Sequence, residues 1–221
     1  MSQARAEILR RVRTALADVP SDEHPQDVHV PRTYAHAGGS QNSEAGTVAA
    51  GQGRVAELMM RIEDYRASAH LVGEQEVAGA IGAALQRRAA RHIAVPDDLP
   101  PAWLTEVDAE VSAAQTLNHP GLGALDGVVT SCAVAIAATG TIVLDGDAGQ
   151  GRRELTLLPD YHLCVVRADQ VVASVAHAVA RLAPQRPLTW ISGPSATSDI
   201  EMHRVEGVHG PRTLEVLIVN D

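Results

Sequence analysis

The sequence predicts an α/β protein in which a parallel-dominated sheet is flanked by helices. Between residues 70 and 95, two short apolar runs enclose one helical pattern, and strand–helix–strand with short connections is typical of a parallel sheet. Short apolar runs of strand length recur later in the chain. The protein has no Phe and only 2% aromatic residues, so its core has to be packed from Ala, Val, Leu and Ile.

The N-terminal residues 3–18 predict an amphipathic helix. Ile8, Leu9, Val12 and Leu16 form one apolar stripe at helical spacing. The arginines lie largely off that stripe: Arg5, Arg10, Arg11 and Arg13. The pattern fits a solvated helix face or an interaction arm.

Residues 19–50 carry Pro, Gly, Ser, His and Asp, and few large apolar groups, which predicts a linker or a long mobile loop. We therefore expect three parts: a helix over 1–18, this linker, and an α/β domain over 51–221. The elements expected in the first half of the domain are a helix over 52–68, a strand over 70–72, a helix over 74–91, a strand over 92–95, a helical turn from 100 to 104 and a strand over 110–112.

The central stretch, residues 127–145, contains two strand-like runs, 128–129 and 142–144. Thr139, Gly140 and Thr141 precede the second run and suggest a tight turn or a close approach of the backbone to a ligand. The elements expected after it are a glycine-rich flexible loop over 145–153, a strand over 163–166, a helix over 169–182, strands over 188–191 and 214–219, and a helix that opens near residues 195–201.

Charge and composition argue against several classes of partner and site. The net charge is −9, which does not suit a surface that follows nucleic-acid phosphates or an anionic membrane. Two cysteines, Cys132 and Cys164, lie in apolar segments without a C-x-x-C spacing, so we expect buried reduced thiols and no iron–sulfur cluster or metal of this chain's own. No apolar leader or span is seen, so a cytoplasmic location is expected.

The candidate ligand site lies where the central stretch meets residues 190–201. Gly146, Gly149 and Gly151 do not match the dinucleotide or P-loop spacings. The loop that contains them delivers an arginine pair, which can bind a carboxylate or phosphate. The residues predicted to bind a ligand are Thr139, Gly140, Thr141, Arg152, Arg153, Gly193, Ser195, Thr197 and Asp199.

Each part of this site has a plainer interpretation. The arginines could pair with local carboxylates such as Glu154 or Asp160. The Ser/Thr/Asp-rich turn after Gly193 could simply cap a helix, because Ser198 and Glu201 fit a capping box and Ser195 is an alternative cap. Ten histidines occur without a metal-binding spacing.

Four segments in order carry a resemblance to a known family: residues 135–144, 151–162, 191–201 and 205–211. They resemble the LUD-domain family, and within it the lactate-utilisation protein C group of bacteria. The resemblance covers roughly residues 50–220. It implies a fold like that of the NagB/RpiA/CoA-transferase superfamily and a role in the oxidation of L-lactate to pyruvate.

The same resemblance implies that the chain is a cluster-free accessory or ligand-binding component, and that iron–sulfur clusters belong to partner proteins. In this family and in CoA transferases an acidic residue often precedes the Thr-Gly or its equivalent; here the position is Ala138, which has nothing to ionise. Kinship with transferases therefore does not establish transferase activity.

Two other functions stay open. A stand-alone enzyme on a CoA-ester, sugar-phosphate or folate-like substrate would need another catalytic group, such as Asp160, His162 or His209. A purely structural interaction protein would use the helix over 3–18 as its docking arm. A small carboxylate or a phosphorylated compound is the ligand expected under the accessory interpretation.

Overall fold

The computed structural model describes residues 3–18, 20, 48–197, 205–206 and 210–220. It divides into two compact units, residues 1–40 and 41–221, and each is considered by itself. The described part of the first unit contains the helix α1 (Gln3–Ala15). The predicted linker lies mostly outside the described residues, and the next helix starts at Val48.

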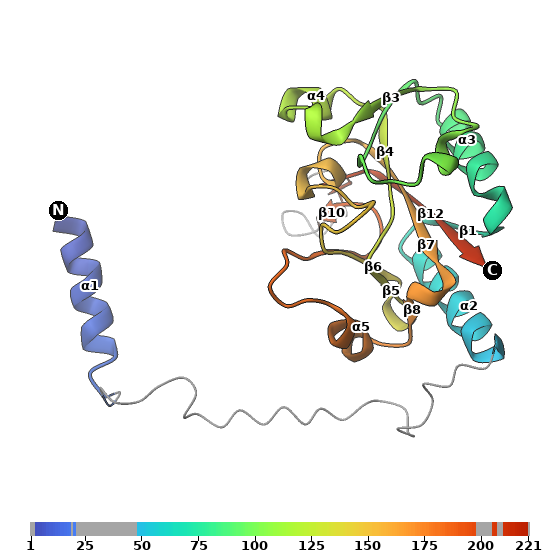
Figure 1. Ribbon diagram of the computed structural model, residues 1–221. Helices are drawn as coiled ribbons and strands as arrows, with labels where there is room; N and C mark the ends of the chain where they lie inside the picture. Colours follow the sequence, from blue (N-terminus) through green and yellow to red (C-terminus); the bar gives the residue numbers. More distant parts are fainter. Residues whose placement is uncertain (1–2, 19, 21–47, 198–204, 207–209, 221) are drawn as a thin grey trace. The chain divides into compact units, whose positions relative to one another are not determined.

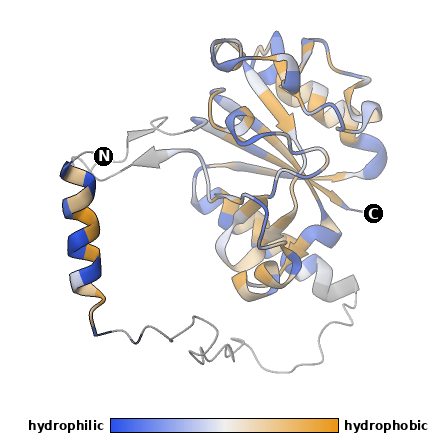
Figure 2. Ribbon diagram, turned by 60° about the vertical axis from the view of Figure 1, so that its left-hand side comes forward, coloured by the Kyte–Doolittle hydropathy of each residue, from blue (hydrophilic) through white to orange (hydrophobic). Residues whose placement is uncertain are grey.

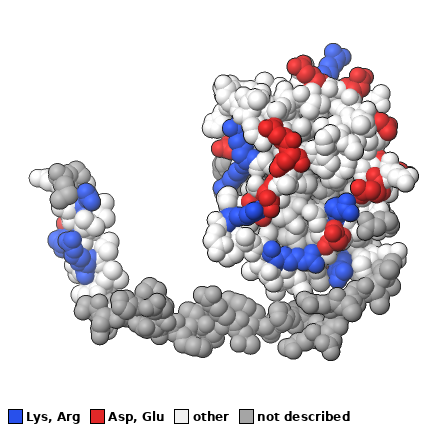
Figure 3. Space-filling model, in the orientation of Figure 1, with Lys and Arg blue, Asp and Glu red and all other residues white. Residues whose placement is uncertain are grey.

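Helix α1 is amphipathic, and none of its described residues is buried. Its apolar stripe is exposed to solvent, with Ile8 61% and Val12 47% accessible. Glu7 pairs with Arg10 at 2.7 Å and with Arg11 at 2.9 Å, and these guanidinium groups lower the pKa of the Glu7 carboxyl. The helix therefore presents separate apolar and basic faces (Figures 2 and 3).

The second unit is built on a six-stranded sheet whose order is β1-β12-β7-β4-β2-β3. Every neighbouring pair is parallel, which confirms the predicted α/β class (Figure 1). The strands, in chain order, are β1 (Ser68–Gly73), β2 (His92–Val95), β3 (Glu110–Ala113), β4 (Gly127–Thr130), β7 (Tyr161–Arg167) and β12 (Thr213–Asn220).

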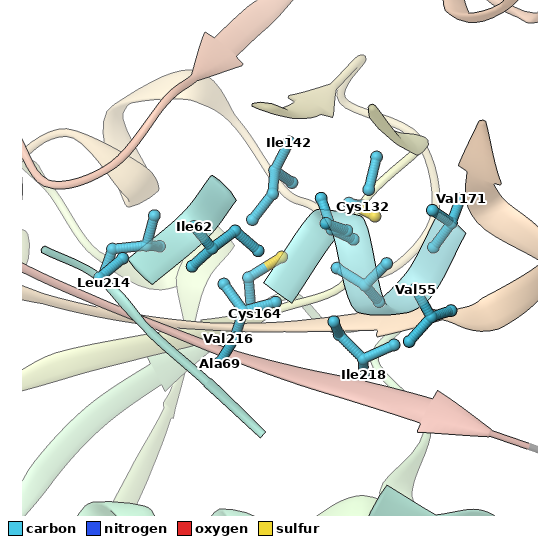
Figure 4. Packing of buried hydrophobic residues seen from close by; sticks show 14 of the residues in the cluster. Val55, Ile62, Ala69, Cys132, Ile142, Cys164, Val171, Leu214, Val216 and Ile218 are labelled. Atoms are coloured by element: carbon cyan, nitrogen blue, oxygen red, sulfur yellow. The ribbon is translucent and has the colours of Figure 1, made fainter. Parts of the chain in front are cut away.

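Helices cover both faces of this sheet. On one face, α3 (Val77–Arg87) contributes Ile81 and Leu85 to a cluster that includes Leu163 and Leu217. On the other face, α2 (Val48–Asp64) contributes side chains that pack over β12 (Figure 4). Alternate residues of each strand point to opposite faces, so a strand between two helical layers has to be apolar along its whole length.

A smaller four-stranded sheet packs beyond α2, in the order β8-β5-β6-β9. Its residues Ala135 and Ile142 join the cluster under α2, whereas Val134 and Val143 face Ala178 of α5. The elements are β5 (Val134–Ile136), β6 (Thr141–Leu144), β8 (Val171–Val172), β9 (Thr189–Ile191) and α5 (Val175–Arg181). A short helix α4 (His119–Gly123) covers part of the larger sheet.

Two predicted helices differ from the structure. The helix expected over 169–182 is replaced by a helical turn, Ala168–Gln170, then β8, and a helix only from Val175. Residues 171–172 pair in parallel with β5, so sheet pairing overrides the helical periodicity. The helix expected near 195–201 does not begin at Ser195, because Ala196–Thr197 is β10 and pairs with β11 (Val205–Glu206); Ser198 and Glu201 lie outside the described residues.

One charged side chain lies inside the sheet. Glu215 of β12 is 2% exposed and accepts hydrogen bonds from the Tyr161 hydroxyl at 2.9 Å and from Arg87 at 2.5 Å. His70 of β1 lies 3.3 Å away. Burial is the main cause that raises the pKa of Tyr161, and the nearby Glu215 carboxylate adds to it. The carboxylate thus connects α3, β1 and β7.

Glu215→Ala should lower the free energy of unfolding by about 3 kcal/mol, because it leaves a buried hydroxyl without its acceptor and Arg87 without its counter-charge. The matched control is Glu110→Ala, since Glu110 and His92 form a pair that is exposed on both sides and worth about 0.5 kcal/mol or less. Urea unfolding followed by circular dichroism measures both. Equal losses for the two variants would contradict the structural role given to Glu215.

Candidate functional site

Two adjoining cavities lie along the edge of the domain. The first, which we call the His162 cavity, has a volume of about 240 Å³ and is lined by His162, Trp190, Gly193 and Leu214 among others. The second, the arginine cavity, has about 570 Å³ and is lined by the loop after β6 together with Arg152, Arg153 and Arg186. Thr156 and Thr189 line both cavities, so the two adjoin.

The loop after β6 is held in place by hydrogen bonds, although the sequence predicts a flexible loop. The backbone N–H of Gly149 donates to Asp98 at 2.9 Å, and its carbonyl accepts from Ser131 at 2.7 Å. Arg186 bridges Asp145 at 3.1 Å and Asp147 at 2.6 Å, and this arginine lowers the pKa of the Asp147 carboxyl. Two of the cavity's carboxylates therefore pair with the same arginine.

The arginine pair of the sequence analysis does not form the local ion pairs considered there. Arg152 donates to the carbonyl of Leu117, Glu154 faces His119, and Asp160 faces Arg212. Arg153 is exposed, and its guanidinium has no ion pair or hydrogen bond with any part of the chain that the structure describes. Arg153 is thus a cation of the arginine cavity whose guanidinium donors are available to an anion.

The Thr139–Thr141 turn lies outside both cavities and serves packing. Gly140 has a φ of +60°, and a Cβ there would lie 2.8 Å from the backbone of Arg61 at the end of α2. The hydroxyl of Thr141 lies 2.9 Å from that of Ser192. The turn therefore meets the second predicted segment, residues 190–201, through a hydrogen bond between β6 and the end of β9.

The second segment contributes Gly193 and Ser195 to the His162 cavity. Gly193 has a φ of +78°, and its closest neighbour is the side chain of Tyr65, 2.5 Å from where a Cβ would be. A larger residue at this position would clash with Tyr65, which explains why it is a glycine. Thr197 lies in β10, and Asp199 lies outside the described residues, so the structure places neither side chain.

His162 is the site residue that the sequence did not single out for ligand binding. It is fully buried on β7, and its Nε2 lies 2.8 Å from the hydroxyl of the equally buried Thr130. Its Nδ1 is buried without a hydrogen-bond partner. The sequence indicates it only as a candidate catalytic group of a stand-alone enzyme. Its contact with Thr130 has no local signature, because β4 and β7 pair only in the fold.

The two cysteines are buried and reduced, as the sequence predicts. Cys164 follows His162 on the same face of β7 and pairs in register with Thr130. The neighbouring Cys132 thiol, and then His162 and Thr130, lower the pKa of Cys164 against the opposing effect of burial. The pKa of Cys132 is raised by the same neighbour and by burial. Within the described residues, no group of His, Cys, Asp or Glu is placed to hold a metal ion.

The model of the LUD domain family matches residues 54–219. The chain belongs to the LUD domain family. A LUD-domain relative from Deinococcus radiodurans, named lactate utilization protein C, is 51% identical over 163 residues, covering 72% of this chain and 76% of the relative. A lactate utilization protein C from Shouchella clausii is 34% identical over 103 residues, covering 42% of this chain and 43% of that protein.

A solved structure shares the LUD-domain fold. The crystal structure of a DUF162 family protein from Deinococcus radiodurans superposes with a TM-score of 0.67 and 41% identity. It covers 77% of this chain and 98% of that protein. Of the described helices, none is long and apolar enough to cross a membrane.

Gly140→Ala should lower the free energy of unfolding by about 2 kcal/mol or more, because a left-handed backbone and a clash with Arg61 act together. The control is Gly123→Ala at the end of α4, where a Cβ meets no heavy atom within 4 Å. That change should stay within about 1 kcal/mol of the wild type. Chemical denaturation curves of both variants test the assignment, and a Gly140→Ala protein as stable as the control would refute it.

Proposed function

We propose that this protein works in lactate utilisation, as the component without iron–sulfur clusters of a system that oxidises L-lactate to pyruvate with iron–sulfur partner proteins. The observation that carries the proposal is the 51% identity to a lactate utilization protein C over about three quarters of both chains. Such a long and close match supports a shared role more strongly than fold alone does.

The cysteine content supports a cluster-free role. Iron–sulfur clusters are held by cysteine thiolates, commonly four, whereas this chain has two. Both are buried in the apolar cluster under α2, and Figure 4 shows Cys164 beside Ile62 and Val216. The electron-transferring groups of the system would then reside in the partners.

A small carboxylate is the ligand that the arginine cavity favours. Arg153 lines this cavity, and its guanidinium can bind a carboxylate through two parallel hydrogen bonds. Asp98, Asp145 and Asp147 line the same cavity and would repel a doubly charged phosphate more strongly. A phosphorylated ligand is therefore the second choice.

A stand-alone enzyme is the alternative that one observation favours, namely the buried His162 beside a cavity. Asp160 is exposed and paired with Arg212, and His209 lies outside the described residues. Turnover by the purified chain on a CoA ester, a sugar phosphate or a folate, lost in a His162 variant, would favour this alternative over an accessory role.

Deletion of the gene from its own host should abolish growth on L-lactate and leave growth on glucose intact, because only lactate oxidation needs the system. A plasmid copy should restore growth, which excludes effects on neighbouring genes. Unimpaired growth of the deletion strain on L-lactate, in a host with no second lactate oxidase, would refute the proposed function.

Helix α1 is the proposed docking arm for the partners, since its apolar stripe is exposed and its other face is basic. Val12→Gln should reduce recovery of iron–sulfur proteins with the tagged chain from lactate-grown cells by about fivefold or more, because it removes apolar contact area. Thr14→Gln on the polar face is the matched control. Mass spectrometry of the co-purified proteins measures both; equal recovery would exclude the stripe as the contact.

A further inference from the structure

The imidazole of His162 is satisfied on one side only. Its Nε2 is engaged by Thr130 at 2.8 Å, and both side chains are fully buried. Its Nδ1 is buried and lacks a partner among the described residues. Buried polar atoms are nearly always hydrogen-bonded in native proteins, and His162 also lines the His162 cavity. The unpaired nitrogen therefore indicates a group that the described residues do not supply.

The cavity next to this ring is suited to a small organic molecule. Its volume of about 240 Å³ corresponds to roughly eight waters at ~30 Å³ each. Leu157, Ile191 and Leu214 give part of its wall an apolar character. Inorganic anions gain little from such a wall, whereas a molecule with a methyl group buries it there.

The two cavities together provide two different binding groups. Thr156 lines both, and it belongs to the helical turn Arg153–Thr156 that carries Arg153. The hydroxyl of Thr156 donates a hydrogen bond to the carbonyl of Arg153 at 3.3 Å. A ligand in the His162 cavity therefore borders the cavity that holds the available guanidinium.

We propose that the His162 cavity binds a short hydroxy acid or oxo acid of the size of lactate or pyruvate. The oxygen on the carbon beside the carboxylate hydrogen-bonds with Nδ1 of His162, and the methyl group contacts the apolar wall. The carboxylate points past Thr156 toward Arg153 of the adjoining arginine cavity. The inference rests on the proposed function for the choice of lactate, and adds the residue that distinguishes these acids from a plain fatty acid.

The tautomer of His162 determines whether pyruvate can form the same hydrogen bond as lactate. When the Thr130 hydroxyl donates to Nε2, Nδ1 carries the proton and donates to a hydroxyl or an oxo oxygen. In the other tautomer Nδ1 only accepts, so it binds the hydroxyl of lactate and not the oxo group of pyruvate. Either tautomer favours lactate over propionate, which lacks this oxygen.

The test is a titration of the full-length protein with L-lactate, pyruvate, propionate and inorganic phosphate by isothermal calorimetry. We expect L-lactate to bind about fivefold more tightly than propionate, the gain of one net hydrogen bond. Phosphate should bind more weakly than lactate. Equal affinities for lactate and propionate, no binding of either, or tighter binding of phosphate would each overturn the proposal.

Two substitutions separate the nitrogens of the ring. In His162→Asn the amide can take the place of Nδ1, and in His162→Gln it can take the place of Nε2 beside Thr130. The preference for lactate over propionate should persist in His162→Asn and disappear in His162→Gln. Thermal unfolding of both variants establishes that they are folded; if either is not, the wild-type comparison of lactate with propionate still decides the question.

A second pair of variants tests the cation. Arg153→Gln should weaken lactate, pyruvate and propionate alike, by about tenfold, because it removes the charge common to their site. Arg91→Gln, at an exposed arginine immediately before β2, is the control and should change nothing. Equal effects of the two substitutions would remove Arg153 from the site.

Failure of this inference and failure of the proposed function give different results. If the deletion strain cannot grow on L-lactate but the purified chain binds none of the acids, the proposed function stands and the proposed binding site is wrong. Selective binding of lactate by a protein whose deletion leaves growth on lactate unchanged supports the site and overturns the function.

Discussion

The structure depends on the insertion of the last strand into the middle of the sheet. β12 lies between β1 and β7 and pairs with both in parallel, so it joins segments from opposite ends of the domain, such as His70 and Leu217. A parallel sheet covered on both faces demands apolar side chains in both directions, and β12 is buried along Leu214 to Val219. Without β12, β1 would have no partner in this sheet.

Glu215 is the exception within that apolar strand, and its position explains how it is tolerated. It lies near the start of β12, opposite Ser68 of β1, where Arg87 of α3 reaches it while staying about half exposed. A buried carboxylate has to be paired and hydrogen-bonded. Tyr161 and Arg87 meet this requirement from two elements, so the charge also fixes how α3 meets the sheet.

The sequence predicted the fold class and most strands because their apolar runs are bounded by turn residues. The strand over 92–95 has the predicted bounds. Strand β5 (Val134–Ile136) was missed, since it is short and lies among small residues without alternation. The helix predicted from Asp169 failed for a related reason: Val171–Val172 follows the helical period, but its pairing with β5 is a long-range contact that no local pattern reports.

Residues of the candidate site could be predicted only where a single segment of the sequence contains the binding groups. Arg153 could be selected from the sequence because it follows a glycine-rich loop and precedes a turn. The role of His162 depends on Thr130 of another strand and on a wall from residues 190–195. Spacing in the sequence cannot report such a combination, and a histidine inside an apolar run looks the same whether it is satisfied or not.

The place of the cavity follows from how one face of the large sheet is covered. Helix α2 covers the half of this face that includes Val216 and Cys164. Leu122 of α4 and Leu155 cover the half that includes Val128. His162 pairs with Val128 on one side and with Leu214 on the other. It therefore lies at the junction between the part of the face covered by α2 and the part covered by α4 and Leu155, where a gap remains between them. The ligand proposed for the cavity would supply the hydrogen bond that a polar side chain at this junction needs, whereas a residue under either cover has to be apolar or fully paired by the chain.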